Sequence, residues 1–174
     1  EELQAQAFRR ATCLRGEVFS FQLAYRADSM LRDLQVAVAS DLQRCIQVRP
    51  VGLAPSEFPG AHFDDNVLRT TPGLYPDPLL APEERLPAPP GQWRSLWVTV
   101  RVPSRIAAGV YPIELALASG GSKLGGGTFT LEVLPATLPA QKLKHTSWFH
   151  ADCIATHYGV DVWSRQHWTL VDRF

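Results

Sequence analysis

The 174-residue sequence contains little cysteine, and its three cysteines are far apart: Cys13, Cys45 and Cys153. They form no CxxC pair, which argues against both a structural zinc site and a disulfide framework. We therefore expect three reduced thiols, most of them buried in apolar surroundings.

A zinc-binding pattern is also missing among the histidines. The candidates with a nearby carboxylate are His145, His150, His157 and Asp152. Their spacing differs from that of HExxH zinc enzymes, and histidines hydrogen-bonded within a fold are commoner than metal ligands. The glycine-rich stretch 120–127 opens no helix, so it is a turn rather than a phosphate-binding loop. No metal and no cofactor is predicted.

The chain has no excess of charge, with 17 basic and 17 acidic side chains. A dedicated nucleic-acid-binding protein needs a basic excess to contact phosphates, so this class is excluded. No apolar run approaches the length of a membrane span, which predicts a soluble chain without a membrane partner. The length is too short for a complete (β/α)8 barrel, which takes about 250 residues.

What the sequence does contain is a series of short segments in which apolar and polar residues alternate. They cover residues 17–24, 34–40, 45–51, 93–102, 110–118 and 127–134. Alternation with period two is typical of half-buried strands, and the glycine-rich stretch 120–127 predicts a hairpin between the last two. With no helical pattern before residue 140, we expect a mainly β fold, an antiparallel β-sandwich over residues 1–137.

Residues 52–92 interrupt this series. Nine prolines lie between Pro55 and Pro90, and proline removes a backbone donor and disfavours helix in the residue before it. We expect a long irregular excursion. Its aromatic and apolar side chains indicate that it packs over a surface, because flexible linkers rarely carry so many such groups.

The last part of the chain changes character. Two prolines in the segment LPATLP (134–139) indicate a domain boundary. Residues 144–149 (KHTSWF) have the pattern of a strand, and residues 164–174 that of an amphipathic helix with Ser164 as its N-cap. We therefore expect a short β/α tail over residues 138–174, and one such unit cannot bury both its faces alone.

Several segments carry a family resemblance over about residues 16–174. They are QWRSLWVTVRVP, AGVYPIELAL, FTLEVLPATLPAQKLKHTSWFHADCIATHYGV and TPGLYPDPLL. PGLYPDPLL and HTSWFHADCIA are the most specific of them. The chain resembles the amino-terminal part of bacterial proteins related to glycoside hydrolase family 123, often labelled domain of unknown function 4091.

The resemblance implies a β-sandwich followed by a (β/α)8 barrel that hydrolyses β-linked N-acetylhexosamine-type glycosides with help from the substrate's acetamido group. Residues 144–149 would be the first barrel strand, and 164–174 would lie in the first barrel helix. The family uses an adjacent Asp-Glu pair on a later barrel strand, and no such dipeptide occurs in this chain. We therefore assign no catalytic residue here and expect the chain to be catalytically silent, with its barrel incomplete.

Two groups of side chains are candidate sugar contacts. Trp148, His150 and Asp152 follow the expected first barrel strand, whose carboxyl end would face the active site of a complete parent. There they would contact substrate, or they would pack in the barrel wall and hold the loop. Tyr75, Trp93 and Trp97 would form an aromatic platform on the sandwich, or they would pack in a core or domain interface.

Two functions follow from these patterns. The first is a non-catalytic sandwich that braces the barrel of a glycoside hydrolase, whose carbohydrate partner binds through the missing barrel. The second is an autonomous carbohydrate-binding or protein-interaction module. The exposed aromatic tail would also allow self-association. The compartment, bacterial cytoplasm or outside the cell, is not indicated by the sequence.

Overall fold

The computed structural model describes residues 7–57, 70–82, 87–144, 146 and 148–173. By its internal contacts the chain divides into two compact units, residues 1–139 and residues 140–174.

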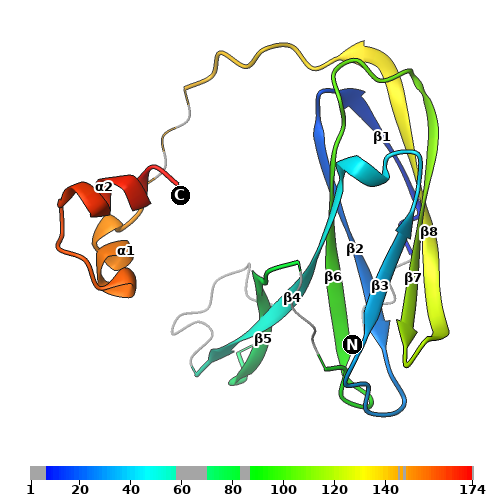
Figure 1. Cartoon of the computed structure of the whole chain (residues 1–174), viewed down its shortest axis with the longest axis horizontal. Coiled ribbons are helices and arrows are strands. Elements are labelled where there is room, and N and C mark those ends of the chain that lie inside the picture. The colour runs from blue at the N-terminus through cyan, green and yellow to red at the C-terminus, as the bar shows by residue number, and fades with distance from the viewer. Residues whose placement is uncertain (1–6, 58–69, 83–86, 145, 147, 174) are drawn as a thin grey trace. The chain divides into compact units, whose positions relative to one another are not determined.

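The described residues of the first unit form eight strands in two four-stranded sheets (Figure 1). One sheet has the order β1-β8-β7-β3 and the other β2-β6-β4-β5. Paired strands are antiparallel except β1 and β8, which are parallel. The strand bounds are β1 Arg10–Arg15, β2 Val18–Arg26, β3 Gln35–Ala39, β4 Ile46–Ser56, β5 Gly73–Leu79, β6 Trp93–Arg101, β7 Gly109–Ser119 and β8 Ser122–Thr137. The predicted mainly β sandwich is confirmed.

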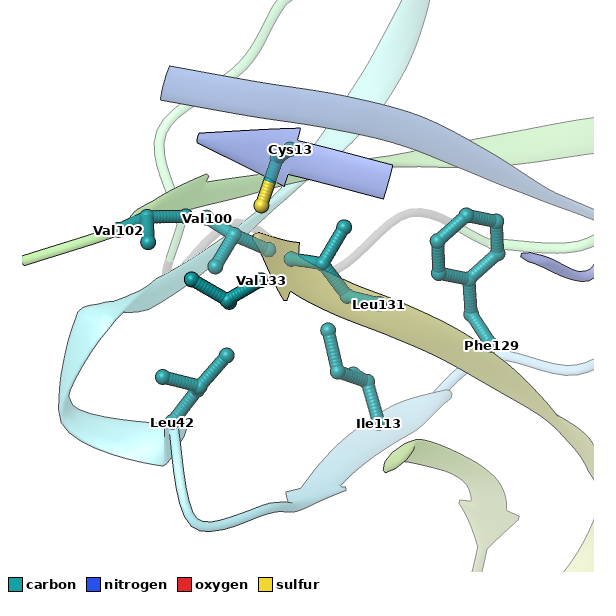
Figure 2. Packing of buried hydrophobic residues seen from close by; sticks show 8 residues of the cluster. All are labelled: Cys13, Leu42, Val100, Val102, Ile113, Phe129, Leu131 and Val133. Carbon is teal, nitrogen blue, oxygen red and sulfur yellow. The ribbon is translucent and has the colours of Figure 1, made fainter. Parts of the chain in front are cut away.

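The core lies where the inward faces of the two sheets meet. The alternation of β6 places Leu96, Val98 and Val100 inward, and each is nearly or fully buried. One cluster of buried side chains in this core is shown in Figure 2: Cys13, Leu42, Val100, Val102, Ile113, Phe129, Leu131 and Val133. Phe21 of β2 stacks on Phe129 of β8 with ring centroids 4.1 Å apart, which joins the two sheets.

A tight hairpin connects β7 to β8. Gly120 and Gly121 have φ of 56° and 80°, the left-handed values that a two-residue type I′ turn requires. The expected hairpin is therefore confirmed, but β8 begins at Ser122 rather than near residue 127. Gly125, Gly126 and Gly127 thus lie in the strand, next to a register shift between the pairs of Leu117 and Ala118.

Two strands were not expected from the sequence. β1 has a weak apolar pattern, and β5 (GLYPDPL) contains two prolines within the stretch predicted to be irregular. Proline is tolerated in a strand at a sheet edge, and β5 is the edge strand beside β4. The prediction of irregular structure was therefore wrong for residues 52–56 and 73–79, while residues 58–69 and 83–86 lie outside the described part of the chain.

The described part of the second unit contains two short helices, α1 (Ala151–Tyr158) and α2 (Arg165–Val171). The predicted helix is confirmed over Arg165–Val171, shorter than the expected 164–174. Its cap is confirmed as well, because the Ser164 side chain accepts a hydrogen bond from the His167 N–H; Phe174 lies outside the described residues. The expected strand over 144–149 is not formed by its described residues 144, 146, 148 and 149. An alternating pattern becomes a strand only beside a partner strand, and no described segment pairs with it.

Helix α1 was not expected from the sequence either. Its N-cap residue, His150, makes no side-chain capping bond, so the usual start signal is missing. Gly159 ends the helix in the left-handed conformation, with φ of 63°. Among the described residues, no helix is long and apolar enough to cross a membrane.

The three cysteines are free thiols, as expected. Cys13 is buried, Cys45 is half-buried and Cys153 is exposed. The expectation that most of them are buried was therefore wrong, because α1, which carries Cys153, packs only one of its faces.

Candidate functional site

The tail candidates Trp148, His150 and Asp152 surround the start of helix α1. All three are exposed, and Trp148 is 98% accessible. Asp152 lies in the first helical turn, where its negative charge interacts favourably with the helix dipole. The three residues are close in sequence, and the structure leaves their side chains open to solvent.

A buried histidine holds this region in place. His167 of α2 is fully buried. Its Nδ1 accepts a hydrogen bond from the Trp163 backbone N–H at 2.8 Å, so its Nε2 carries the proton and donates to the Ala151 carbonyl, also at 2.8 Å. His167 thereby links α2 to the first turn of α1, between His150 and Asp152. The sequence placed His167 on an apolar stripe and did not indicate this polar role.

Metal binding gains no support from the described residues. Within the described ranges, no group of three or more His, Cys, Asp or Glu side chains is placed to hold a metal ion. Of the histidines considered above, His145 lies outside those ranges.

The aromatic residues considered as a sugar platform on the sandwich, Tyr75, Trp93 and Trp97, lie in two separate places. Tyr75 lies on the edge strand β5, where its hydroxyl donates to the Thr71 carbonyl. Trp93 and Trp97 lie on β6, and β4 separates the two strands. The three residues therefore do not form one platform, because a whole strand intervenes.

The two tryptophans of β6 share one face of their sheet. They are four residues apart, which corresponds to about 13 Å along a strand. Trp93 is 65% exposed, and the Arg26 guanidinium lies over its ring, 5.8 Å from the centroid. Trp97 is half-buried and pairs with Gln22 of β2 on one side. Trp93 is thus a large exposed aromatic surface held by a cation–π contact.

Two adjoining hollows lie beside Trp93. The larger has a volume of about 810 Å³ and the smaller about 510 Å³. They share the lining residues Leu23, Ala24, Trp93 and Gly126, and we call the pair the Trp93 groove. Both volumes lie in the range of small-molecule sites. Sequence reasoning singled out Trp93, but nothing in the pattern indicated the groove or its other lining residues.

Two buried ionisable groups have shifted pKa values. Burial raises the pKa of the Tyr25 hydroxyl, and the nearby Arg94 guanidinium acts in the opposite direction. Tyr25 lines the smaller hollow, where its protonated hydroxyl is one of the polar groups of the wall. Burial and the negative charge of Glu17 raise the pKa of the Cys13 thiol, which is part of the core.

The fold resembles that of a solved glycoside hydrolase. No family model and no curated protein matches the sequence. Among solved structures, a family 123 glycoside hydrolase from Clostridium perfringens, described in connection with glycolipid glycan hydrolysis, matches with a TM-score of 0.74 and 12% identity. The match covers 97% of this chain and 31% of that chain. At this identity the likeness shows a shared fold, so the chain has the fold of part of a family 123 glycoside hydrolase.

Proposed function

We propose that this chain is the amino-terminal part of a glycoside hydrolase related to family 123. In this proposal residues 1–137 form a non-catalytic β-sandwich that braces a (β/α)8 barrel, and residues 138–174 begin that barrel. The observation that carries the proposal is the fold match over 97% of this chain and 31% of a family 123 enzyme. The motifs PGLYPDPLL and HTSWFHADCIA agree with the same relationship.

The chemistry of the described residues agrees with a supporting role. An acid–base or nucleophilic mechanism needs several reactive groups aimed at one point. The tail candidates are exposed to solvent around the start of α1, and the sandwich candidates are apolar or aromatic. The catalytic carboxylates would therefore come from later barrel strands of a longer parent, acting on β-linked N-acetylhexosamine-type glycosides. In that parent Trp148, His150 and Asp152 would contact the sugar.

A hydrolysis assay tests this proposal. The 174-residue chain and its longer parent are compared on 4-nitrophenyl N-acetyl-β-D-galactosaminide and on the corresponding glucosaminide. We expect the parent to release nitrophenol and the 174-residue chain to release none above the uncatalysed rate. Cleavage by the short chain, or an inactive but folded parent, would overturn the proposal.

A second candidate is a protein-interaction role for the second unit. Trp148, Trp163 and Trp168 are each more than half exposed, and exposed aromatic groups of this kind mark contact surfaces. Sedimentation velocity over a concentration series tests whether this chain associates with itself through them. A monomer at all concentrations would exclude self-association.

A further inference from the structure

Among the residues that the structure describes, one flank of the sandwich is open. β2 is the edge strand of its sheet. On the other sheet, β1 pairs with β8 only from Thr130 onward, so among the described residues the stretch from Ser122 to Phe129 pairs with β7 alone. The Trp93 groove is lined from both sides of this opening, by residues 20–27 and 124–129. The groove therefore follows from the order in which the strands pair, and not from the side chains of a single loop.

Glycines of β8 keep the groove hollow. Gly125 pairs with the buried Leu117, so a side chain at position 125 would point to the same inner face as Leu117. A Cβ atom built there meets no heavy atom within 4 Å. At Gly127, a Cβ would be only 3.7 Å from the Leu23 Cδ1. The open space beside Gly125 is thus part of the smaller hollow, and any large residue at 125 would fill it.

The lining combines an aromatic face with polar groups of several kinds. Trp93 is in the wall of both hollows. The polar side chains of the larger hollow are Arg9, Ser20, Gln22 and Thr128, and those of the smaller are Tyr25, Arg26, Asp28 and Ser29. Donors and acceptors are both present, and charges of both signs occur. An apolar ligand would leave these groups without partners, and two arginines against Asp28 give too small a basic excess for a polyanion.

A sugar chain fits this combination. A pyranose ring has a face of C–H groups that packs on an indole and a rim of hydroxyls that donate and accept hydrogen bonds. The two hollows continue past Trp93 on both sides, so a ligand longer than one ring would occupy both. We propose that the Trp93 groove binds a neutral oligosaccharide, with one pyranose packed on the part of the Trp93 indole that Arg26 leaves exposed, and polar rims formed by Gln22 on one side and Arg26 and Asp28 on the other.

This site is independent of the hydrolase proposal. It lies on the first unit, which contains none of Trp148, His150 or Asp152. A parent that cleaves glycosides but binds no sugar at the groove would support the hydrolase proposal and overturn the groove proposal. An inactive parent whose groove binds sugar would have the opposite result. In the hydrolysis assay above, the Trp93→Ala parent should therefore retain its rate on the small aryl glycoside.

A glycan array tests the groove directly. The labelled 174-residue chain is applied to printed neutral, sialylated and sulfated oligosaccharides, and neutral hits are titrated by calorimetry. Trp93→Ala removes the aromatic face, and Gly125→Tyr fills the smaller hollow from the opposite strand. We expect each to weaken binding by roughly tenfold or more, equivalent to about 1.4 kcal/mol. Trp168→Ala, which removes a tryptophan of similar exposure outside the groove, should bind as the wild type does.

Folding controls keep the result interpretable. Trp93 is 65% exposed, and the Cβ of residue 125 meets open space, so both variants should keep the wild-type circular dichroism spectrum and thermal midpoint. No binding to any neutral glycan, binding to acidic glycans alone, or full binding by both folded variants would overturn the assignment. Equal loss in the Trp168→Ala control would also overturn it.

Discussion

The three consecutive glycines of β8 allow a matched test of how closely the β7–β8 ladder is packed. Gly126 pairs with Ala116 of β7, and a Cβ built on Gly126 would lie 2.1 Å from the Leu115 carbonyl oxygen. At the neighbouring Gly125, the same atom meets nothing within 4 Å. We therefore expect Gly126→Ala to destabilise the sandwich and Gly125→Ala to leave it intact.

The magnitude follows from the size of the clash. Contacts of a real Cβ closer than 3.0 Å essentially never occur, so the Leu115 carbonyl must retreat by 3.0 − 2.1 = 0.9 Å. This shift disturbs the ladder beside Leu115, which is 2% exposed. A buried group left without its hydrogen bond costs roughly 1–3 kcal/mol and local backbone strain roughly another 1–3 kcal/mol. We expect Gly126→Ala to lower the free energy of unfolding by about 2–6 kcal/mol, and Gly125→Ala to change it by less than about 1 kcal/mol.

Urea unfolding followed by tryptophan fluorescence and circular dichroism measures both variants against the wild type. A lower midpoint with an unchanged m value would show lost stability rather than a changed unfolded state. Failure of Gly126→Ala alone to fold would agree with the same reasoning. Equal stability of the two variants would refute it, because both the space around the Cβ and the positive φ of 155° at Gly126 disfavour alanine there and not at Gly125.

Two further predictions concern buried polar groups. His167→Ala removes the acceptor of the Trp163 N–H, so exchange of that amide proton should accelerate by roughly tenfold or more, and an unchanged rate would contradict the linking role. The raised pKa of Cys13 means that the folded state favours the protonated thiol. Its contribution is complete below the usual thiol pKa of 9.0 and declines as pH rises, because the unfolded chain then releases the proton first. Cys13→Ala should therefore lose less unfolding free energy than the wild type as the pH rises through 9.0 in urea titrations, and parallel losses would exclude this effect.

Much of the sandwich was predictable because its signal is local. The alternation of Leu96, Val98 and Val100 reports a strand with one buried face, and the structure buries all three. The hairpin glycines and the Ser164 cap are equally local, since each satisfies backbone groups within a few residues. The exceptions are β5, whose prolines are acceptable only at a sheet edge, and the strand expected over 144–149, which has no described partner.

The candidate sites depended on contacts that sequence patterns do not encode. Trp93 was identifiable as an aromatic residue on a strand, but its neighbours in the groove come from β2 and β8 as well as β6. His167 looked like part of an apolar stripe, and only its two hydrogen-bond partners show that it joins two helices. Tyr75 was grouped with the tryptophans because of its residue type, and the strand order separates it from them.

By itself, then, the sequence determined the strand periodicity, the turns and the balance of charge, because these follow from the steric and solvation preferences of each residue and its near neighbours. Only the tertiary structure decided which strands are edges, where the sandwich is open, and which polar groups line that opening. These features arise from pairing between distant segments: β1 meets β8 only from Thr130 onward, and the glycines before it then leave room beside Trp93.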